Sequence, residues 1–316
     1  MPGAARLARF VVYHVHSRHK PEQDVLVREK SFNEFESLFE RASIPVFDLP
    51  RIAPARIAAV LTGTALDNSL LELTAAVAER FNSATSVCWP RVMDGERAAS
   101  LARKFKLEPD GPFAGHPELG GLLNDLGAQL AILGAAPAGD AAETDSGIDA
   151  LVFGCDAPVL IVRQPVDPEV VFSRILHSLS GDLQEIRHLA YSFSLVAQDG
   201  SLTLMHTVEE EELHDLRDTL RVSPGVSEDS GDKLVQDLAG HAERYLKGMV
   251  AASHGESYTV SYRLAVGDVL DVIRYELAEG GYSLLVVGTH EDGKSRIGAD
   301  DYRLLHHISG LPVLAL

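Results

Sequence analysis

One arrangement of apolar runs and glycines occurs twice in this chain, and this repeat limits what the chain can fold into. Near the C-terminal end, a strand-length apolar run stops at Gly288, and a second apolar run begins at Pro312 after a polar loop and a short helical stretch. Earlier, the same order runs from Gly134 to Pro158. The glycine-to-proline spacing is 24 residues in both places. The chain is therefore predicted to be an internal duplication.

The apolar runs show no alternation with polar residues, which is typical of strands buried on both faces of a parallel sheet. In the second copy, strands alternate with amphipathic segments that have helical spacing. Strands are predicted at 172–179, 201–208, 258–266, 283–287 and 311–316, and helices at 183–197, 232–253, 268–279 and 300–308. This order predicts a doubly wound parallel sheet with right-handed crossovers.

The first copy has the same order in a shorter form. Strands are predicted at 56–61, 83–89, 106–115, 128–134 and 157–162, and helices at 67–81, 96–105 and 117–126. The first strands lie 118 residues apart (Ile57 to Ile175), whereas the fourth-strand glycines lie 154 apart. The first copy therefore lacks 36 residues, most of them around its second helix.

The chain divides into three parts on this reading. Residues 1–54 form an N-terminal extension that fits neither copy, residues 55–164 form the first domain, and residues 169–316 form the second. The linker between the domains is short, so the two copies should pack as one body. The expected fold class is α/β, with two Rossmann-like doubly wound parallel sheets in tandem.

Composition excludes several classes of partner. The 316 residues carry a net charge of −18, which argues against binding to nucleic acid or to anionic membranes through bulk charge. No apolar stretch approaches the ~20 residues that span a bilayer, so we expect a cytoplasmic protein without membrane insertion. The two cysteines, Cys88 and Cys155, lie at or beside apolar runs and are expected to be buried free thiols.

The second copy resembles the universal stress protein family in its tandem two-domain form. The segments that carry the resemblance are RILHSLSGD at 174–182, LTLMHTVE at 202–209, AVGDVLDVI at 265–273, LLVVGTHEDGKSRIG at 284–298 and LPVLAL at 311–316. The resemblance implies an adenine nucleotide alpha hydrolase-like fold and, in many members, an ATP site. That site uses an acidic residue after strand one and a Gly-x-x-Gly loop after strand four. Nine residues further on, it uses a Gly-Ser/Thr pair.

Both copies depart from this pattern. The strand-one acid is replaced by Thr62 in the first copy and by Ser180 in the second. The strand-four loop carries Pro137, which lacks an N–H donor, or Glu291, which repels phosphate. Asp300 and Asp301 stand in the Gly-Ser/Thr region of the second copy.

We therefore expect degenerate nucleotide sites and no cofactor, with ATP in the second domain as the alternative. The residues of that candidate site are Ser180, Gly181, Gly288, Thr289, Gly293, Lys294, Ser295 and Arg296.

Histidines and acidic residues form other clusters. His14, His16 and His19 are interpreted as an exposed strand face, with a metal site as the alternative. Glu209–Glu212 opens a long acidic loop, either solvated or a patch for a cation or basic partner. His206 at the end of its strand is expected to make a structural hydrogen bond.

A serine-hydrolase reading of His177, Ser180 and Asp182 is disfavoured. No G-x-S-x-G elbow surrounds the serine, and strand alternation sends His177 and Ser180 to opposite faces. The adjacent His306 and His307 are expected on a helix, where they point too far apart to chelate a metal together.

These observations favour a non-enzymatic stress-response regulatory or binding protein with an unknown protein partner. Two alternatives remain: a nucleotide-binding protein that uses the second domain, with weak ATP turnover, and a cytosolic accessory protein of a membrane transporter. The chain is expected to be a homodimer, or a monomer that mimics a dimer internally. The two copies are predicted to be related by a pseudo-twofold axis, with the apolar strands at 158–162 and 312–316 paired with each other as neighbouring edge strands.

Overall fold

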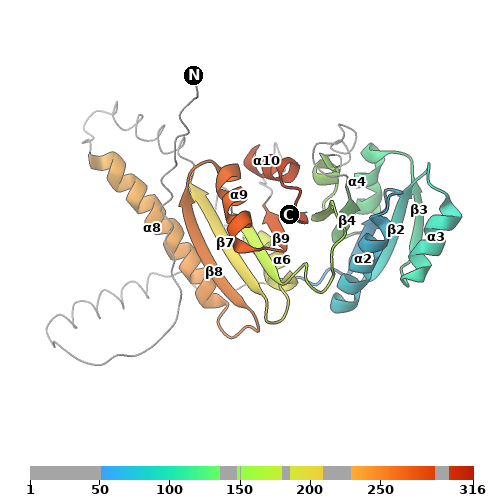
Figure 1. Cartoon of the computed structure of the whole chain (residues 1–316), viewed down its shortest axis with the longest axis horizontal. Helices are drawn as coiled ribbons and strands as arrows, with labels where there is room; N and C mark the ends of the chain where they lie inside the picture. Colours follow the sequence, from blue (N-terminus) through green and yellow to red (C-terminus); the bar gives the residue numbers. More distant parts are fainter. Residues whose placement is uncertain (1–50, 136–147, 150, 180–185, 209–228, 289–298) are drawn as a thin grey trace, which may run out of the picture.

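The computed structural model describes residues 51–135, 148–149, 151–179, 186–208, 229–288 and 299–316. In these residues, strands and helices alternate twice, once in each copy (Figure 1). The elements of the first copy are β1 (Arg56–Val60), α2 (Asp67–Phe81), β2 (Ala84–Pro90), α3 (Gly95–Lys104), β3 (Pro109–Phe113), α4 (His116–Asp125), β4 (Leu130–Gly134) and β5 (Val159–Val162). Those of the second are β6 (Arg174–Leu179), α6 (Ile186–Leu195), β7 (Ser201–Val208), α8 (Asp229–Ala252), β8 (Thr259–Val266), α9 (Val269–Gly280), β9 (Leu284–Val287), α10 (Ala299–His307) and β10 (Val313–Ala315).

The strands of both copies form one sheet in the order β3-β2-β1-β4-β5-β10-β9-β6-β7-β8. The two predicted sheets are therefore halves of a continuous one, joined where β5 and β10 pair antiparallel. Leu160 lies opposite Leu314, its own counterpart at the 154-residue spacing of the repeat. Val159 pairs with Ala315 and Ile161 with Val313, which is the register that a local twofold axis produces. The predicted meeting of these two strands is confirmed.

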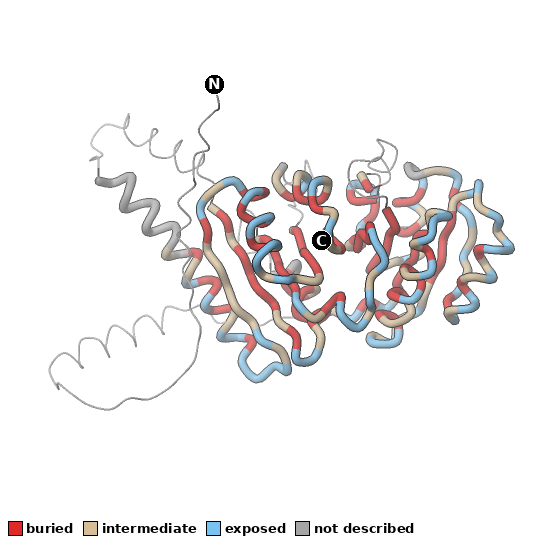
Figure 2. The backbone as a smooth tube through the Cα atoms, viewed as in Figure 1, coloured by how far each residue is buried: buried red, intermediate tan, exposed pale blue. Residues whose placement is uncertain are grey.

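Helices cover both faces of the sheet, and each face has a core that runs across both halves. On one face, α2, α3, α6 and α8 pack on the strands, and on the other α4, α9 and α10 do so together with Ile148, Leu151 and Val152. Leu160 and Leu314 belong to the first core, whereas Val159 and Val313 belong to the second. Figure 2 shows the buried residues concentrated in the strands and on the inner sides of the helices. The β5–β10 pair is thus buried from both sides.

Arginines of the first copy reach helix ends of the second on both faces. Arg80 donates to the carbonyl oxygens of Ser194, Leu195 and Val196 at 3.0, 2.7 and 2.6 Å, at the C-terminal end of α6. Arg163 donates to the carbonyl oxygen of Leu305 in the last turn of α10 at 2.6 Å. Carbonyl groups at a helix C-terminus lack intrahelical partners and carry partial negative charge, so a cation stabilises them. The two halves are fixed to each other by these contacts as well as by the sheet.

No helix in the described part of the chain combines the length and the apolar character needed to cross a membrane.

Replacing Arg80 by Met should weaken the contact between the halves. The substitution keeps much of the aliphatic stem but leaves the carbonyl groups at the end of α6 without their donor. We expect the free energy of unfolding in urea to fall by about 1–3 kcal/mol. Arg274→Met, on the exposed side of α9, is the matched control. It should stay within about 0.5 kcal/mol of the parent protein, and an equally small loss for Arg80→Met would contradict the prediction.

Candidate functional site

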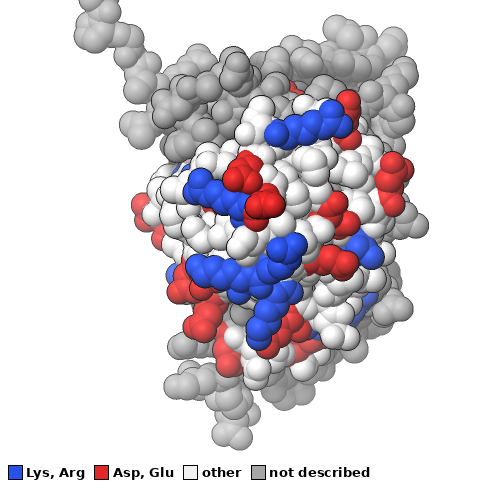
Figure 3. Space-filling view, turned by 90° about the vertical axis from the view of Figure 1, so that its right-hand side faces the viewer, with Lys and Arg blue, Asp and Glu red and all other residues white. Residues whose placement is uncertain are grey.

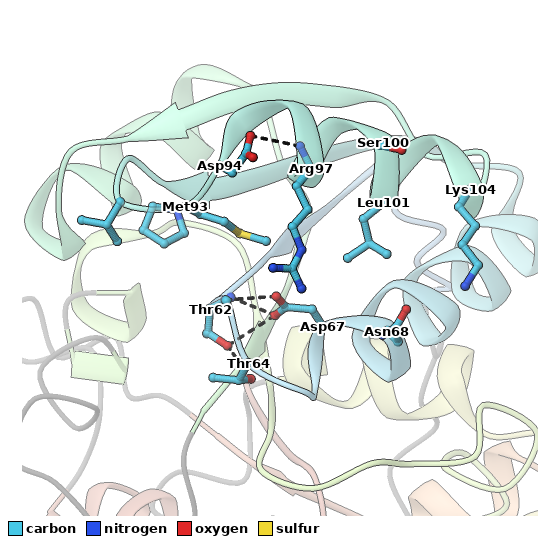
Figure 4. A pocket seen from close by; sticks show the side chains of 13 residues that line it. Thr62, Thr64, Asp67, Asn68, Met93, Asp94, Arg97, Ser100, Leu101 and Lys104 are labelled. Atoms are coloured by element: carbon cyan, nitrogen blue, oxygen red, sulfur yellow. Dashed lines mark hydrogen bonds between the residues drawn. The ribbon is translucent and has the colours of Figure 1, made fainter.

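A pocket of about 780 Å³ opens at the carboxyl ends of β1 and β2, between α2 and α3 (Figure 4). Ligands of open α/β sheets bind outside the carboxyl ends of the strands, so the position is the expected one for this fold class. Polar, charged and apolar side chains contribute to its wall. They are Thr62, Gly63, Thr64, Asp67, Asn68, Pro90, Val92, Met93, Asp94, Arg97, Ser100, Leu101 and Lys104.

Asp67 organises the loop that follows β1. Its side chain is only 3% exposed, and its two carboxylate oxygens accept hydrogen bonds from the backbone N–H groups of Thr62 and Gly63, each at 3.0 Å. Gly63 has a φ of +77°, a left-handed conformation that favours glycine. The first residue of α2 therefore folds the loop back towards the end of β1. The sequence pattern predicts Asp67 as the start of a helix but carries no signal for this contact.

Asp94 has the corresponding role at the start of α3. Its Oδ1 atom accepts hydrogen bonds from the backbone N–H groups of Glu96 and Arg97, at 3.0 and 3.3 Å. This is N-capping of the usual kind, in which the side chain serves N–H groups that have no partner within the helix. The cap fixes the start of α3 beside the end of β2.

One face of α3 then borders the pocket. Arg97, Ser100, Leu101 and Lys104 follow each other at helical spacing, and all four line the cavity. Figure 4 shows the Arg97 guanidinium pointing across the cavity towards Asp67, while Lys104 lies at the far end near Asn68. Two cationic side chains therefore project into the pocket from a single helix.

The pocket lies beside the crevice that the family resemblance implies for phosphate. That crevice would lie between the ends of β1 and β4. A Cβ atom added at Gly134 would lie 3.3 Å from Leu70 Cδ1 and 3.5 Å from Thr62 Oγ1, so these side chains pack against the end of β4. The cavity is lined by the loop after β1, by the end of β2 with the loop that follows it, and by α2 and α3, and not by β4. The loop at 136–147, with Pro137, lies outside the described residues.

Little of the predicted site in the second copy can be placed. Gly288 directly follows β9 and is half-buried. The other predicted residues lie outside the described residues, namely Ser180, Gly181, Thr289, Gly293, Lys294, Ser295 and Arg296. The same holds for Glu291, for the histidines His14, His16 and His19, and for Glu209–Glu212.

Two histidines of the second copy have structural contacts. His206 Nδ1 lies 3.0 Å from the carbonyl oxygen of Leu179, which confirms the structural hydrogen bond predicted for it. His177 is buried, with its Nδ1 atom 2.8 Å from Ser192 Oγ. Ser192 belongs to α6 and is a different serine from the one considered in the sequence. Within the described residues, no three His, Cys, Asp or Glu side chains are grouped to hold a metal ion.

Known structures with the same architecture contain two such domains in one chain. The sequence itself matches no protein-family model and no curated protein. A protein of unknown function from Pseudomonas aeruginosa PAO1 is 16% identical, and the match covers 84% of this chain and 92% of that one, with a TM-score of 0.53. A universal stress protein from Archaeoglobus fulgidus DSM 4304 is 14% identical, and the match covers 82% of this chain and 97% of that one, with a TM-score of 0.53. The chain has the tandem universal stress protein fold. The predicted fold class is confirmed.

Replacing Asp67 by Ala should destabilise the protein. The substitution leaves the N–H groups of Thr62 and Gly63 without their acceptor, which should lower the free energy of unfolding by about 1–3 kcal/mol. Asp67→Asn keeps one oxygen acceptor and should lose less. Glu72→Ala, at an exposed position of the same helix, is the control for urea denaturation. Equal stabilities of the Asp67 and Glu72 variants would show that the carboxylate does not hold the loop.

The two cysteines should be unreactive in the folded protein. Both are buried thiols that form no disulfide, as predicted, and burial raises the pKa of Cys88 to about 12, with a smaller contribution from the charge of Asp110. Because the thiolate is the reactive form, neither thiol should react with a chromogenic disulfide reagent at pH 8 until denaturant is added. Rapid reaction of either thiol in the native protein would contradict this prediction.

Proposed function

We propose that the chain is a non-enzymatic regulatory protein of the universal stress type, which binds a small polar metabolite in the pocket of its first copy. The observation that carries this proposal is the pocket itself. Its volume of about 780 Å³ lies within the ~300–1,000 Å³ typical of small-molecule sites, and it opens at the carboxyl ends of parallel strands. In this role, a protein partner would bind the ligand-free and the ligand-bound forms of the chain with different affinity.

The residues around the pocket support binding rather than catalysis. Thr62, Thr64 and Ser100 supply hydroxyl groups, but neither histidine nor cysteine is among the lining residues. The two carboxylates, Asp67 and Asp94, already accept hydrogen bonds from backbone N–H groups. A hydroxyl nucleophile needs a general base within hydrogen-bond reach, and the described part of this wall offers none that is uncommitted.

A triphosphate suits the pocket less well than a smaller ligand. The resemblance implies that phosphates sit on the loop after strand four, where the first copy has Pro137 and the second has Glu291. A proline removes a backbone donor, and a carboxylate repels a polyphosphate. We therefore infer that both family-type phosphate sites are degenerate, while the pocket beside β2 remains usable.

The ligand can be identified by mass spectrometry of small molecules released from freshly purified, denatured protein. We expect one polar metabolite at a substantial fraction of the protein concentration. Ser100→Trp should abolish its retention, because the indole group would occupy the pocket, whereas Arg103→Trp on the same helix lies outside the lining and should retain it. Retention by both variants would place the ligand elsewhere, and its loss on Glu291→Lys would place it in the second copy.

Mg-ATP should bind weakly or not at all. Calorimetry at physiological ionic strength should give a dissociation constant above the micromolar range, because the first copy lacks the donor at Pro137 and the second carries Glu291. A micromolar constant, or release of phosphate from ATP over hours that Glu291→Ala alters, would favour the alternative of a nucleotide-dependent second domain.

A further inference from the structure

Positive charge is concentrated on and around α3. Within residues 91–106 there are five basic and two acidic residues, in a chain whose net charge is −18. All five basic side chains are exposed, namely Arg91, Arg97, Arg103, Lys104 and Lys106. Figure 3 looks onto this end of the molecule and shows Lys and Arg side chains gathered there, with acidic ones around them. The local charge therefore opposes that of the whole chain.

Two of these five residues, Arg97 and Lys104, line the pocket. They are seven residues apart, close to two helical turns, so they lie on the same face of α3 about 10 Å apart along its axis. Ser100 and Leu101 lie between them on that face. The helix thus presents to the cavity a cation at each end, with a hydroxyl group and an apolar side chain in the middle.

The acidic and the basic side chains of the pocket differ in the contacts that they already make within the protein. The carboxylates of Asp67 and Asp94 accept hydrogen bonds from backbone N–H groups at 3.0–3.3 Å. The guanidinium group of Arg97 takes part in none of the ion pairs among the described residues, and Lys104 Nζ lies over the ring of Phe105 at 5.2 Å. The acidic groups are committed to the fold, whereas the basic groups face the cavity. This asymmetry favours an anionic ligand.

We propose that Arg97 and Lys104 form a subsite for the phosphate group of a phosphomonoester, a small molecule with a single phosphate. This inference rests on the proposed function and names the class of ligand. The planar fork of Arg97 suits two oxygens of one phosphate, and Lys104, two turns further along the same face of α3, adds a second positive charge to the cavity that attracts the dianion at longer range. The phosphate would then lie on α3, on the opposite side of β1 from the strand-four loop. The rest of the ligand would lie against Thr62, Asn68 and Met93.

Trp89 is a built-in reporter for the test. It is the single tryptophan of the chain, it is 5% exposed, and it directly precedes Pro90 of the pocket wall. Its Nε1 atom lies 3.6 Å from the position that a Cβ atom would take at Gly95, the first residue of α3. A ligand held between β2 and α3 should therefore change its fluorescence.

The experiment compares two matched pairs of probes, AMP with adenosine and ribose 5-phosphate with ribose, by Trp89 fluorescence and by calorimetry. We expect the phosphorylated member of a pair to bind at least about tenfold more tightly than its parent, and the difference to shrink as salt increases. Arg97→Gln should remove most of this difference in affinity, and Lys104→Gln should remove a smaller part of it. Arg97→Lys should retain part of the difference that Arg97→Gln removes. Arg103→Gln, which removes an equal charge outside the pocket, should leave it unchanged.

Three results would overturn the proposal, and they are distinguishable. If a probe or the co-purified metabolite binds and Ser100→Trp blocks it, but Arg97→Gln and Lys104→Gln do not matter, the pocket functions and the phosphate subsite is wrong. If the co-purified ligand lacks a phosphate group, the proposed class of ligand is wrong. If neither the probes nor any co-purified molecule occupies the pocket, the subsite falls together with the proposed function.

Discussion

The antiparallel pairing of β5 with β10 is the contact on which the rest of the structure depends. Each is a short apolar strand buried on both faces, and each would be an exposed edge of its own half. An apolar strand edge is a site for aggregation, so mutual pairing removes two hazards at once. It also makes the two cores continuous across the joint. Arg80 and Arg163 then fix helix ends of the second half from opposite faces of the sheet.

The β5–β10 pairing constrains the middle of the sheet, whereas the two copies can differ in length and sequence at its ends. The second crossover shows this most clearly: α3 has 10 residues, whereas its counterpart α8 has 24. The whole connection has 18 residues between β2 and β3 but 50 between β7 and β8, so 32 of the 36 residues by which the copies differ fall far from β5 and β10. The pocket lies on this divergent side, between α2 and the short helix α3. The residues that line the pocket can therefore differ between related chains without disturbing the contact that holds the halves together.

Sequence patterns predicted the elements well because the signals for them are local. The helix at Asp67–Phe81 and the strand at Ser201–Val208 have the predicted bounds, since apolar periodicity and a terminating residue define each of them. The meeting of β5 and β10 followed from their edge position. The pocket could not be predicted from the sequence, because the family pattern places the site at position 62 and at the loop after strand four. That Asp67 turns back to Thr62, and that Arg97 faces it across a cavity, depends on tertiary packing.

The loss of the strand-one acid thus has a different meaning in the first copy than the sequence suggests. A carboxylate is still present at the end of β1, but it comes from Asp67 and its oxygens hold the backbone of the loop. A group bound in this way shapes the wall of the pocket and is poorly available to the ligand. Recognition must then come from groups that the fold leaves unsatisfied. In the described wall, these are the donors of α3, and the proposed function assigns recognition of the ligand to them rather than to a carboxylate after β1.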